Sequence, residues 1–269
     1  MSWAPRRGNI GRVSLPEPLQ SFHAIEASFA GLLQSVDTRV GYFRAARLEG
    51  RVLPNTYEAL RLELTYNSNA IEGNTLTLRE TQLVIEGKTP PGGKALREVY
   101  EARNHDRALR QMEDWTRQRI ADPISERELL ELHAMVLQDI DSASAGHYRS
   151  ERVRIAGSGF IPPANHRFAE LIPLAFTRVH VESLHPILRA AEFHYNLVAV
   201  HPFSDGNGRT SRLMMNYALM RENYPPALIE VSRRSEYLAA LDDANHGRVT
   251  PFAELIAESV VRALDQLLV

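Results

Sequence analysis

Apolar residues recur at intervals of three and four along most of this chain, which is the spacing of one buried face on an α-helix. In the stretch 19–48, for example, Phe22, Ile25, Phe29 and Leu33 fall on one such face. The same pattern predicts helices over 54–73, 77–87, 94–119, 125–140, 169–182, 186–200, 213–220 and 236–244, and from 250 onward. We therefore expect an all-α fold.

Local signals mark several ends of these helices. Thr77 and Glu80, and likewise Ser125 and Glu128, have the spacing of a capping box, which predicts a helix start at each pair. Gly73 is a suitable stop for the second helix. The remaining signals are Pro54 and Pro251 at first helical positions, with Thr250 as the cap before Pro251, and Ser235 as an N-cap.

One stretch, 148–161, departs from the helical pattern. Val153 and Ile155 alternate with polar residues, and a Gly-Ser-Gly turn follows at 157–159. This alternation predicts a short β-hairpin, closed by the prolines at 162–163.

The chain divides into three parts by composition. Residues 1–16 carry prolines and glycines but few apolar groups, and we interpret them as a flexible arm. The sequence TPPGG at 89–93 is typical of a linker. We therefore expect an N-terminal helical extension over 17–92 and one compact helical core over 93–269.

Composition excludes several classes of function. The hydrophobic content of 44% and the charged content of 24% are ordinary for a globular protein. A net charge of −2 argues against nucleic acid as a partner. No run of apolar residues is long enough to cross a membrane, and the N-terminus lacks the apolar core of a signal peptide. Without cysteine the chain forms no disulfides, so we expect a cytoplasmic protein with no membrane partner.

The sequence HPFSDGNGRTSR at 201–212 lies between two apolar helices and has the residue types of a phosphate site. The start of a helix offers unpaired N–H groups and a partial positive charge. Gly206 and Gly208 let the backbone approach an anion closely, while Arg209 and Arg212 add two guanidinium groups on one helix face.

Two further side chains of this stretch carry candidate chemistry. Asp205 could ligate Mg²⁺, which usually enters such sites on one or two carboxylates and the phosphates of the substrate. His201 could take a proton from an attacking hydroxyl. The spacing matches neither the P-loop nor the dinucleotide-binding pattern, and a structural turn with a buried histidine would use the same residue types. The residues alone therefore leave both interpretations open.

The same twelve residues resemble, without a gap, the HPFx[DE]GNGRxxR signature of the Fic domain family, which transfers AMP from ATP to protein hydroxyls. The resemblance implies a Fic fold with 93–269 as its catalytic core. It also implies that His201 is the catalytic base and that Asp205 holds Mg²⁺ or Mn²⁺. The nucleotide-binding positions that it implies are Gly206, Asn207 and Gly208 at the α-phosphate and Arg209 and Arg212 at the outer phosphates.

A second motif, SNAIEGN at 68–74, also resembles a Fic pattern. Without further context, Glu72 would be interpreted as a solvated surface glutamate. The segment nevertheless fits the inhibitory pattern [ST]xxxE[GN]N through Ser68, Glu72 and Asn74. The resemblance implies that Glu72 pairs with Arg212 and competes with the γ-phosphate of ATP, as in intramolecularly autoinhibited members of the family.

The resemblance extends over about 65–268 to the core of the animal endoplasmic-reticulum Fic enzymes. We expect neither the membrane anchor nor the tetratricopeptide repeats of those enzymes in this protein. The expected hairpin corresponds to the family's flap, which pairs with the target protein through Val153, Arg154, Ile155, Ala156 and Gly157. Asn245 lies in the segment that the family places near the adenine. His194 and His201 could suggest a metal pair, but a structural role suits His194 better.

The resemblance predicts an autoinhibited adenylyltransferase that uses ATP and modifies a serine, threonine or tyrosine of a protein, including itself. Two alternatives stay open. Glu72 could orient a water molecule, so that the same site removes AMP from a modified protein. The site could also sense a nucleotide without turnover. A homodimer is expected from the resemblance alone.

Overall fold

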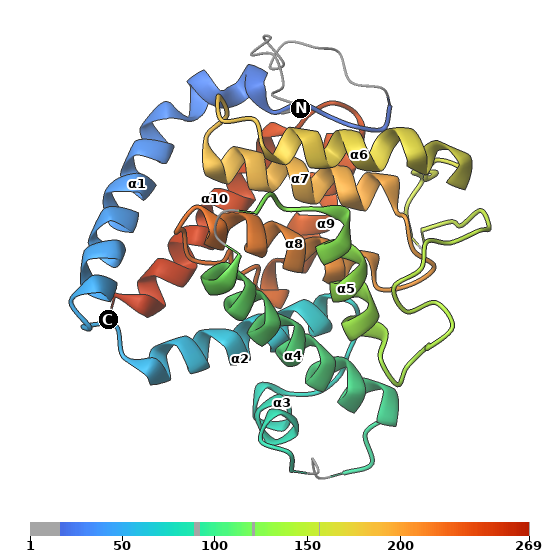
Figure 1. Ribbon diagram of the computed structural model, residues 1–269, viewed down its shortest axis with the longest axis horizontal. Helices are drawn as coiled ribbons and strands as arrows, with labels where there is room; N and C mark the ends of the chain where they lie inside the picture. The colour runs from blue at the N-terminus through green and yellow to red at the C-terminus, as the bar shows by residue number, and fades with distance from the viewer. Residues whose placement is uncertain (1–16, 89–91, 120–121, 156, 269) are drawn as a thin grey trace.

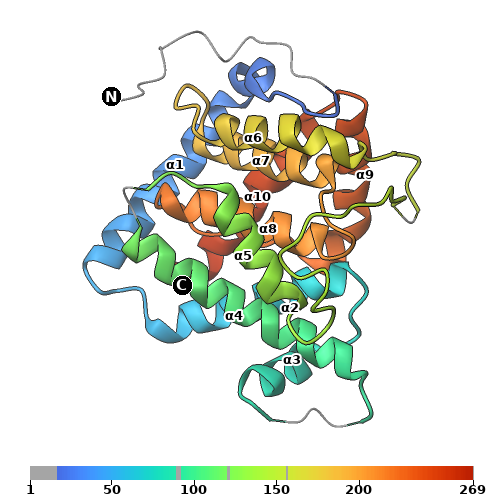
Figure 2. The ribbon, with the colours of Figure 1, turned by 45° about the vertical axis from the view of Figure 1, so that its right-hand side comes forward.

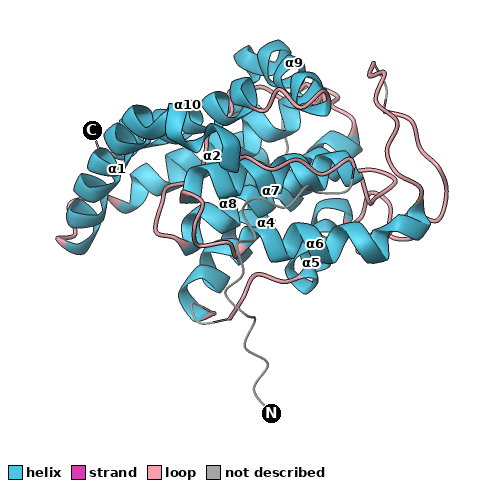
Figure 3. Ribbon diagram, turned by 90° about the horizontal axis from the view of Figure 1, so that it is seen from above, coloured by secondary structure: helices cyan, strands magenta, loops and turns pink. Residues whose placement is uncertain are grey.

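The computed structural model describes residues 17–88, 92–119, 122–155 and 157–268, so the arm expected over 1–16 lies outside the described residues. Within these ranges the chain forms ten α-helices and no strand (Figure 3). In order, they are α1 (Glu26–Leu48), α2 (Pro54–Ile71), α3 (Leu78–Ile85), α4 (Leu96–Gln118), α5 (Glu126–Leu137), α6 (Phe168–Val179), α7 (Pro186–Val200), α8 (Asn207–Arg221), α9 (Arg234–Asn245) and α10 (Thr250–Leu267). The expected all-α fold is confirmed.

Helices α7 and α8 form the centre of the molecule, because most residues of both helices are buried (Figure 1). Almost every residue of α7 is buried, including Leu188, Phe193 and Leu197. Helices α4, α5, α6 and α10 pack around this pair. A helix that is buried on nearly all of its faces needs such neighbours on every side. The loop between α7 and α8 is thereby held by two helices that cannot shift easily.

Helix α2 joins the N-terminal region to this centre. It packs against α4, α8 and α10, while α1 lies along one edge of the molecule against α10 (Figure 1). Leu60, Leu64 and Ile71 of α2 belong to the same hydrophobic cluster as the buried residues of α7 and α8. The C-terminal end of α2 therefore reaches the α7–α8 loop from a fixed direction.

Most predicted helix ends agree with the structure. The two expected capping boxes start α3 and α5, and α2 ends just before Gly73, whose φ is +100°. Two predicted caps are wrong. A 3₁₀ turn at Val231–Arg233 leads directly into α9, so Ser235 lies inside the first turn of that helix. Similarly, Thr250 is already the first helical residue of α10, and Val249 is its N-cap.

The predicted β-hairpin is also wrong as a paired structure. The described residues of 148–163 contain no strand, and Ala156 lies outside the described residues. Their one backbone turn bond runs from the Ser158 N–H to the Ile155 carbonyl, at 3.2 Å. The segment projects from the helical body as a loop (Figure 2). A lone two-stranded hairpin is only marginally stable without further strands or a helix packed against it. We call the segment 150–161 the flap loop below.

No helix among the described residues is both long enough and apolar enough to traverse a bilayer.

Candidate active site

The loop between α7 and α8 begins at His201 and ends at Gly206. His201 ends α7 in the left-handed conformation, with φ +49°, and its N–H still donates to the Leu197 carbonyl at 3.0 Å. Gly206, with φ +76°, is the N-cap of α8. These two unusual backbone conformations turn the chain sharply, so the His201 side chain and the first N–H groups of α8 belong to one short loop.

Asn207 holds this loop in shape. Its Oδ1 accepts a hydrogen bond from the Phe203 N–H at 2.9 Å, and its Nδ2 donates to the Phe203 carbonyl at 2.8 Å. The side-chain amide is therefore engaged with the loop backbone. Of the groups expected at the α-phosphate, Asn207 can offer its backbone N–H, but its side chain serves the loop.

His133 of α5 supports the same loop from below, and the sequence patterns had not singled it out. Its ring stacks on Phe203, with ring centroids 3.6 Å apart. Its Nδ1 accepts from the Gly146 N–H at 3.0 Å, so its Nε2 carries the proton and donates to the Asp205 carbonyl at 3.0 Å. Burial lowers the pKa of His133 to about 4, which keeps this neutral tautomer near neutral pH.

Asp205 lies between two arginines. Its Oδ1 accepts from the Gly206 N–H at 2.6 Å and from Arg209 at 3.2 Å, and its Oδ2 pairs with Arg97 of α4 at 2.5 Å. Partial burial alone would raise the pKa of Asp205, but Arg209, the Gly206 N–H and Arg97 together hold it below its usual value. Arg209 also pairs with Glu101 at 3.2 Å. The carboxylate is therefore ionised, and its side chain stays 42% exposed.

Arg212 is buried, with 4% of its surface exposed. Its Nε donates to Ser68 Oγ at 3.0 Å, and its Nη2 donates to the Ser68 carbonyl and to Glu72 Oε1, both at 2.8 Å. The ring of Tyr237 lies beneath the guanidinium, 5.9 Å from it. The end of α2 thus supplies three of the acceptors of this one side chain.

Glu72 extends across the first turn of α8. A Cβ at position 208 would lie only 2.2 Å from Glu72 Oε1, so glycine at this position makes room for the carboxylate. The Glu72 side chain stays 40% exposed, whereas its partner Arg212 is almost fully buried. A carboxylate therefore occupies the space over the N–H groups of α8, where an anion is favoured by the helix dipole.

Asn74 fixes the turn that aims Glu72. Its Oδ1 accepts from the Leu76 N–H at 3.0 Å, and its Nδ2 donates to Glu101 Oε2 at 2.9 Å and to the Glu98 carbonyl at 3.1 Å. The last residue of the SNAIEGN motif therefore ties the chain after α2 to α4.

The His201 imidazole is neutral near neutral pH. Burial lowers its pKa to about 4, and Arg149 acts in the same direction; the Val198 carbonyl, Glu72 and Asp205 act in the opposite direction. Its Nδ1 has no hydrogen-bond partner among the described residues. A neutral ring can accept a proton, which is the requirement for a general base.

Arg149 connects the flap loop to His201, and sequence reasoning missed it. It lies after the 125–140 helix in a stretch without periodicity, which gave no signal of burial. Its guanidinium donates to three carbonyls, those of His201 at 2.8 Å, Glu151 at 2.6 Å and Pro163 at 2.7 Å. Arg149 thereby links the start of the flap loop, and the chain just after its end, to the residue expected to act as the base.

Two other histidines are buried deep in the fold. His105 of α4 lies beside Arg209 and Arg212, and burial lowers its pKa to about 3. Neither of its ring nitrogens has a hydrogen-bond partner among the described residues. His194 stacks on Phe252, and its Nε2 meets the Tyr237 hydroxyl at 2.9 Å, a structural arrangement without metal-ligating neighbours. In the part of the chain that the structure describes, no three His, Asp or Glu residues are grouped to hold a metal.

Asn245 lies at the end of α9, half-buried, with its Oδ1 accepting from the Tyr195 hydroxyl at 3.1 Å. No hydrogen bond between described residues links it to the α7–α8 loop, and its expected role near the adenine stays a prediction. The same holds for target docking by the described flap residues Val153, Arg154, Ile155 and Gly157.

Comparisons with known proteins identify this arrangement. The Fic/DOC family model matches residues 123–219. Protein adenylyltransferase Fic of Drosophila persimilis is 37% identical over 237 residues, which are 87% of this chain and 46% of that protein. The Nematostella vectensis protein of the same name is 40% identical over 207 residues, which are 76% of this chain and 48% of that protein. The chain thus spans about half the length of the curated relatives that it matches.

Solved structures extend the similarity to the whole fold. The structure of a Fic-1 fragment from C. elegans superposes with a TM-score of 0.78 and 33% sequence identity, covering 91% of this chain and 73% of the fragment. A Fic-domain signaling protein from Bacteroides thetaiotaomicron gives a TM-score of 0.76 with 28% identity, over 87% of this chain and 94% of that one. This chain belongs to the Fic/DOC family.

Proposed function

We propose that the protein is an autoinhibited adenylyltransferase, which transfers AMP from ATP to a serine, threonine or tyrosine hydroxyl of a protein. The names of its relatives support this activity. The single observation that carries the proposal is the Glu72 carboxylate over the first turn of α8, paired with Arg212 at 2.8 Å. A site that attracts one carboxylate in this way is suited to a phosphate when the carboxylate leaves.

The nucleotide would bind where Glu72 now lies. The backbone N–H groups around Gly206 and Gly208 would hold the α-phosphate, since the first N–H groups of a helix have no intrahelical partner. Arg209 and Arg212 would hold the outer phosphates with their planar, fork-shaped donors. Both guanidiniums already have carboxylate partners at the site, namely Glu101 and Glu72.

His201 would act on the hydroxyl of the target protein. The hydroxyl oxygen attacks the α-phosphorus of ATP, and its proton passes to the neutral imidazole. The bond between the α-phosphorus and the oxygen that bridges to the β-phosphate breaks, and pyrophosphate leaves with that electron pair. The products are an AMP-modified protein and pyrophosphate. Positioning and fixed charges would supply most of the rate enhancement.

Asp205 is the residue that would hold Mg²⁺ or Mn²⁺. One ionised carboxylate is enough for a cation that takes its other ligands from ATP phosphates and water, and the pKa of Asp205 is held below its usual value. When bound, the cation would neutralise phosphate charge as pyrophosphate departs. Arg97, which now pairs with Asp205 Oδ2, would orient the carboxylate from the side of α4.

Autoinhibition follows from the overlap of Glu72 with the expected γ-phosphate. A charge-assisted bond to a buried guanidinium is stronger than a bond between neutral groups, so the carboxylate competes well for Arg212. It also brings a negative charge next to a polyphosphate. Removal of this side chain should therefore increase productive binding of ATP.

A second candidate function is the removal of AMP from a modified protein. Glu72 Oε1 binds Arg212, but Oε2 receives no hydrogen bond from any described residue. An unpaired carboxylate oxygen beside the active site could orient a water molecule for attack on the phosphorus of an AMP ester. Homodimer formation and a cytoplasmic location are further proposals that rest on the family resemblance and on the composition.

The chemistry can be tested by incorporation of label from α-³²P-ATP into protein. The Glu72→Gly variant should label itself, and Glu72→Gly with His201→Ala should lose activity by about a hundredfold or more while still binding ATP. Glu72→Gly with His166→Ala, a change at an exposed histidine, is the matched control. Unchanged labelling after loss of His201 would contradict the assignment of the base. If no variant acquires a covalent label, the result would favour removal of AMP or nucleotide sensing without turnover. Removal of AMP would then be tested with a modified protein.

A further inference from the structure

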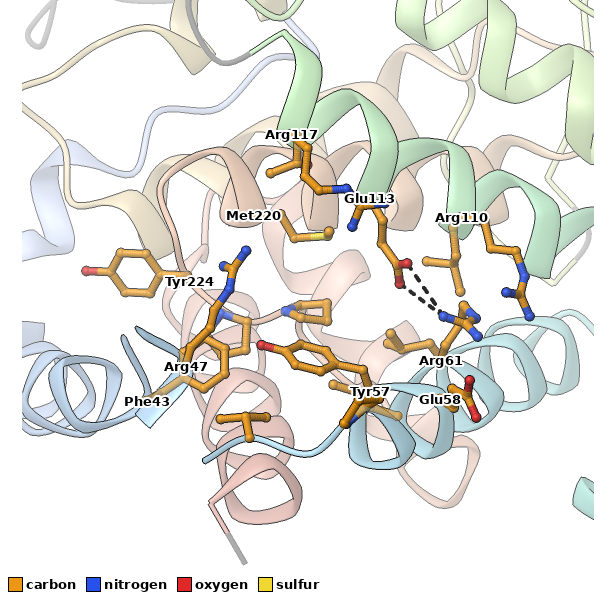
Figure 4. A pocket seen from close by; sticks show the side chains of 18 residues that line it. Phe43, Arg47, Tyr57, Glu58, Arg61, Arg110, Glu113, Arg117, Met220 and Tyr224 are labelled. Carbon is orange, nitrogen blue, oxygen red and sulfur yellow. Dashed lines mark hydrogen bonds and ion pairs between the residues drawn. The ribbon is translucent and has the colours of Figure 1, made fainter. Parts of the chain in front are cut away.

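A cavity of about 460 Å³ lies among the end of α1, the start of α2, the second half of α4 and the end of α8 (Figure 4). Its volume is within the range of pockets that hold small organic ligands. Leu64 lines this cavity and also faces the small void beside Ser68 and Arg212. Because neither Ser68 nor Arg212 lines the cavity, it is distinct from the candidate active site.

The floor and much of the wall of the cavity are apolar. Two aromatic rings, Phe43 from α1 and Tyr57 from α2, lie 6.5 Å apart by their centroids on one side. Apolar side chains from α2, α4 and α8 complete the surface; they include Leu60, Leu109 and Met220. Such a surface suits a flat or branched apolar group, which gains free energy as it leaves water.

On one side of the cavity, most of the charged residues form ion pairs with one another. Arg61 bonds to Asp106 at 3.1 Å and lies 3.5 Å from Glu113, and Arg110 bonds to the other oxygen of Asp106 at 2.9 Å. Figure 4 shows Arg61 and Glu113 paired with each other on this side of the cavity. These groups satisfy one another and leave little charge for a ligand.

On the opposite side of the cavity, the guanidinium of Arg47 has no carboxylate partner among the described residues. No described acidic residue lies within ion-pair distance of Arg47, which enters the cavity lining from α1. Arg117 lines the cavity from α4, and its partner Asp114 is not part of the lining. This side of the cavity therefore has an excess of positive charge.

Tyr57 adds a neutral donor at the same place. Its hydroxyl is buried, has no hydrogen-bond partner among the described residues, and points toward the side where Arg47 lies (Figure 4). Burial raises the pKa of Tyr57, so the hydroxyl keeps its proton. A buried hydroxyl without a partner is unfavourable, and an acceptor from a ligand would remove that penalty.

We propose that this cavity is a binding site for a small aromatic carboxylate. The ring would lie against Phe43, Leu60 and Met220, and the carboxylate would accept hydrogen bonds from Arg47 and the Tyr57 hydroxyl. Arg47 can bind a carboxylate with two parallel N–H donors. The combination of an apolar floor, an unpaired guanidinium and an unsatisfied hydroxyl favours this class over neutral or cationic ligands.

The test compares 1-naphthaleneacetate with the uncharged 1-naphthaleneacetamide, by calorimetry and ligand-observed NMR on the full chain. The acid should bind the wild type at least about tenfold more tightly than the amide, the effect of a hydrogen-bonded charge. Arg47→Gln should reduce acid binding to the level of the amide. The control Arg79→Gln changes an arginine of α3 that does not line the cavity, and it should bind the acid as the wild type does.

A second variant tests the location without a change of charge. Thr116 lines the cavity from α4, and Thr116→Trp should fill the space and abolish binding of both compounds, with circular dichroism confirming that the variant folds. Equal affinity for acid and amide would overturn the proposed ligand class. Acid binding that survives Thr116→Trp, or no binding of the acid at millimolar concentration, would overturn the site.

Discussion

Glu72 and Arg212 are 140 residues apart in the sequence and meet with 2.8 Å between Oε1 and Nη2. The contact joins the last turn of one helix to the first turns of another, so each residue is held by a rigid element. Glu72 is the only carboxylate of the SNAIEGN motif, and Arg212 is the last residue of the HPFSDGNGRTSR motif. The contact therefore joins the two motifs. The proposed regulation of the enzyme depends on this pair.

The pair has a supporting residue, Ser68, whose effect can be measured separately. Ser68→Ala removes the acceptor at 3.0 Å from Arg212 Nε but keeps Glu72. A lost hydrogen bond of about 1 kcal/mol should weaken the hold on Arg212 and raise self-labelling about fivefold above wild type. The effect should be smaller than that of Glu72→Gly.

Ser235→Ala, at an exposed serine of α9, is the control for this measurement. If labelling by Ser68→Ala equals that of wild type, Ser68 has no part in restraining Arg212.

Arg149 should control the reaction through the position of His201. Lysine cannot reproduce the fork that donates to the three carbonyls of His201, Glu151 and Pro163. In the Glu72→Gly background, Arg149→Lys should lower kcat at least about tenfold, the effect of losing bonds to a charged group, and leave KM for ATP nearly unchanged.

The matched control is Arg152→Lys, because Arg152 is exposed and has no described hydrogen-bond partner in the flap loop. A rise in KM for ATP with unchanged kcat would show that Arg149 serves the nucleotide instead of the base.

The buried histidines should make stability depend on pH. Burial and the nearby Arg212 and Arg209 lower the pKa of His105 to about 3, below the ordinary 6.5 of an unfolded chain. The unfolded state therefore binds the extra proton between these values, and the free energy of unfolding falls as pH drops below 6.5. His105→Gln should reduce this slope by about 1.4 kcal/mol per pH unit.

Denaturant unfolding between pH 7.5 and 5 would measure how the free energy of unfolding changes with pH in the wild type and in His105→Gln. His166→Gln, at an exposed histidine, should retain the slope of the wild type. A slope unchanged by His105→Gln would mean that His105 is not held neutral in the folded protein.

The periodic pattern of apolar residues predicted much of the fold. Helix α7 was predicted at its observed bounds, because Pro186 marks its start and a long apolar run follows. The alternation at Val153 and Ile155 gave a wrong prediction of a β-hairpin, because alternation indicates a strand only where a partner strand and a buried face exist. The cap at Ser235 failed because a 3₁₀ turn precedes α9, and short turns of this kind leave no clear sequence pattern.

The two motifs predicted the site in part. The pairing of Glu72 with Arg212 was implied by the family resemblance. The support given by His133, Arg97 and Arg149 was not foreseen, since these residues come from three separate segments and meet the loop only in the folded chain. Nor did the motif reveal that the Asn207 side chain holds the loop backbone, because an asparagine in a glycine-rich loop could equally face a ligand.

The most direct test of the account is the rate of α-³²P label transfer by Glu72→Gly relative to wild type, measured at equal protein, Mg²⁺ and ATP concentrations. Glu86→Gly, an exposed glutamate at the end of α3, serves as the control for the substitution itself. We expect at least tenfold more label on Glu72→Gly than on either wild type or the control, on the order of the 1.4 kcal/mol that one charge-assisted contact supplies. Equal or lower labelling of Glu72→Gly would contradict the claim that this carboxylate restrains AMP transfer.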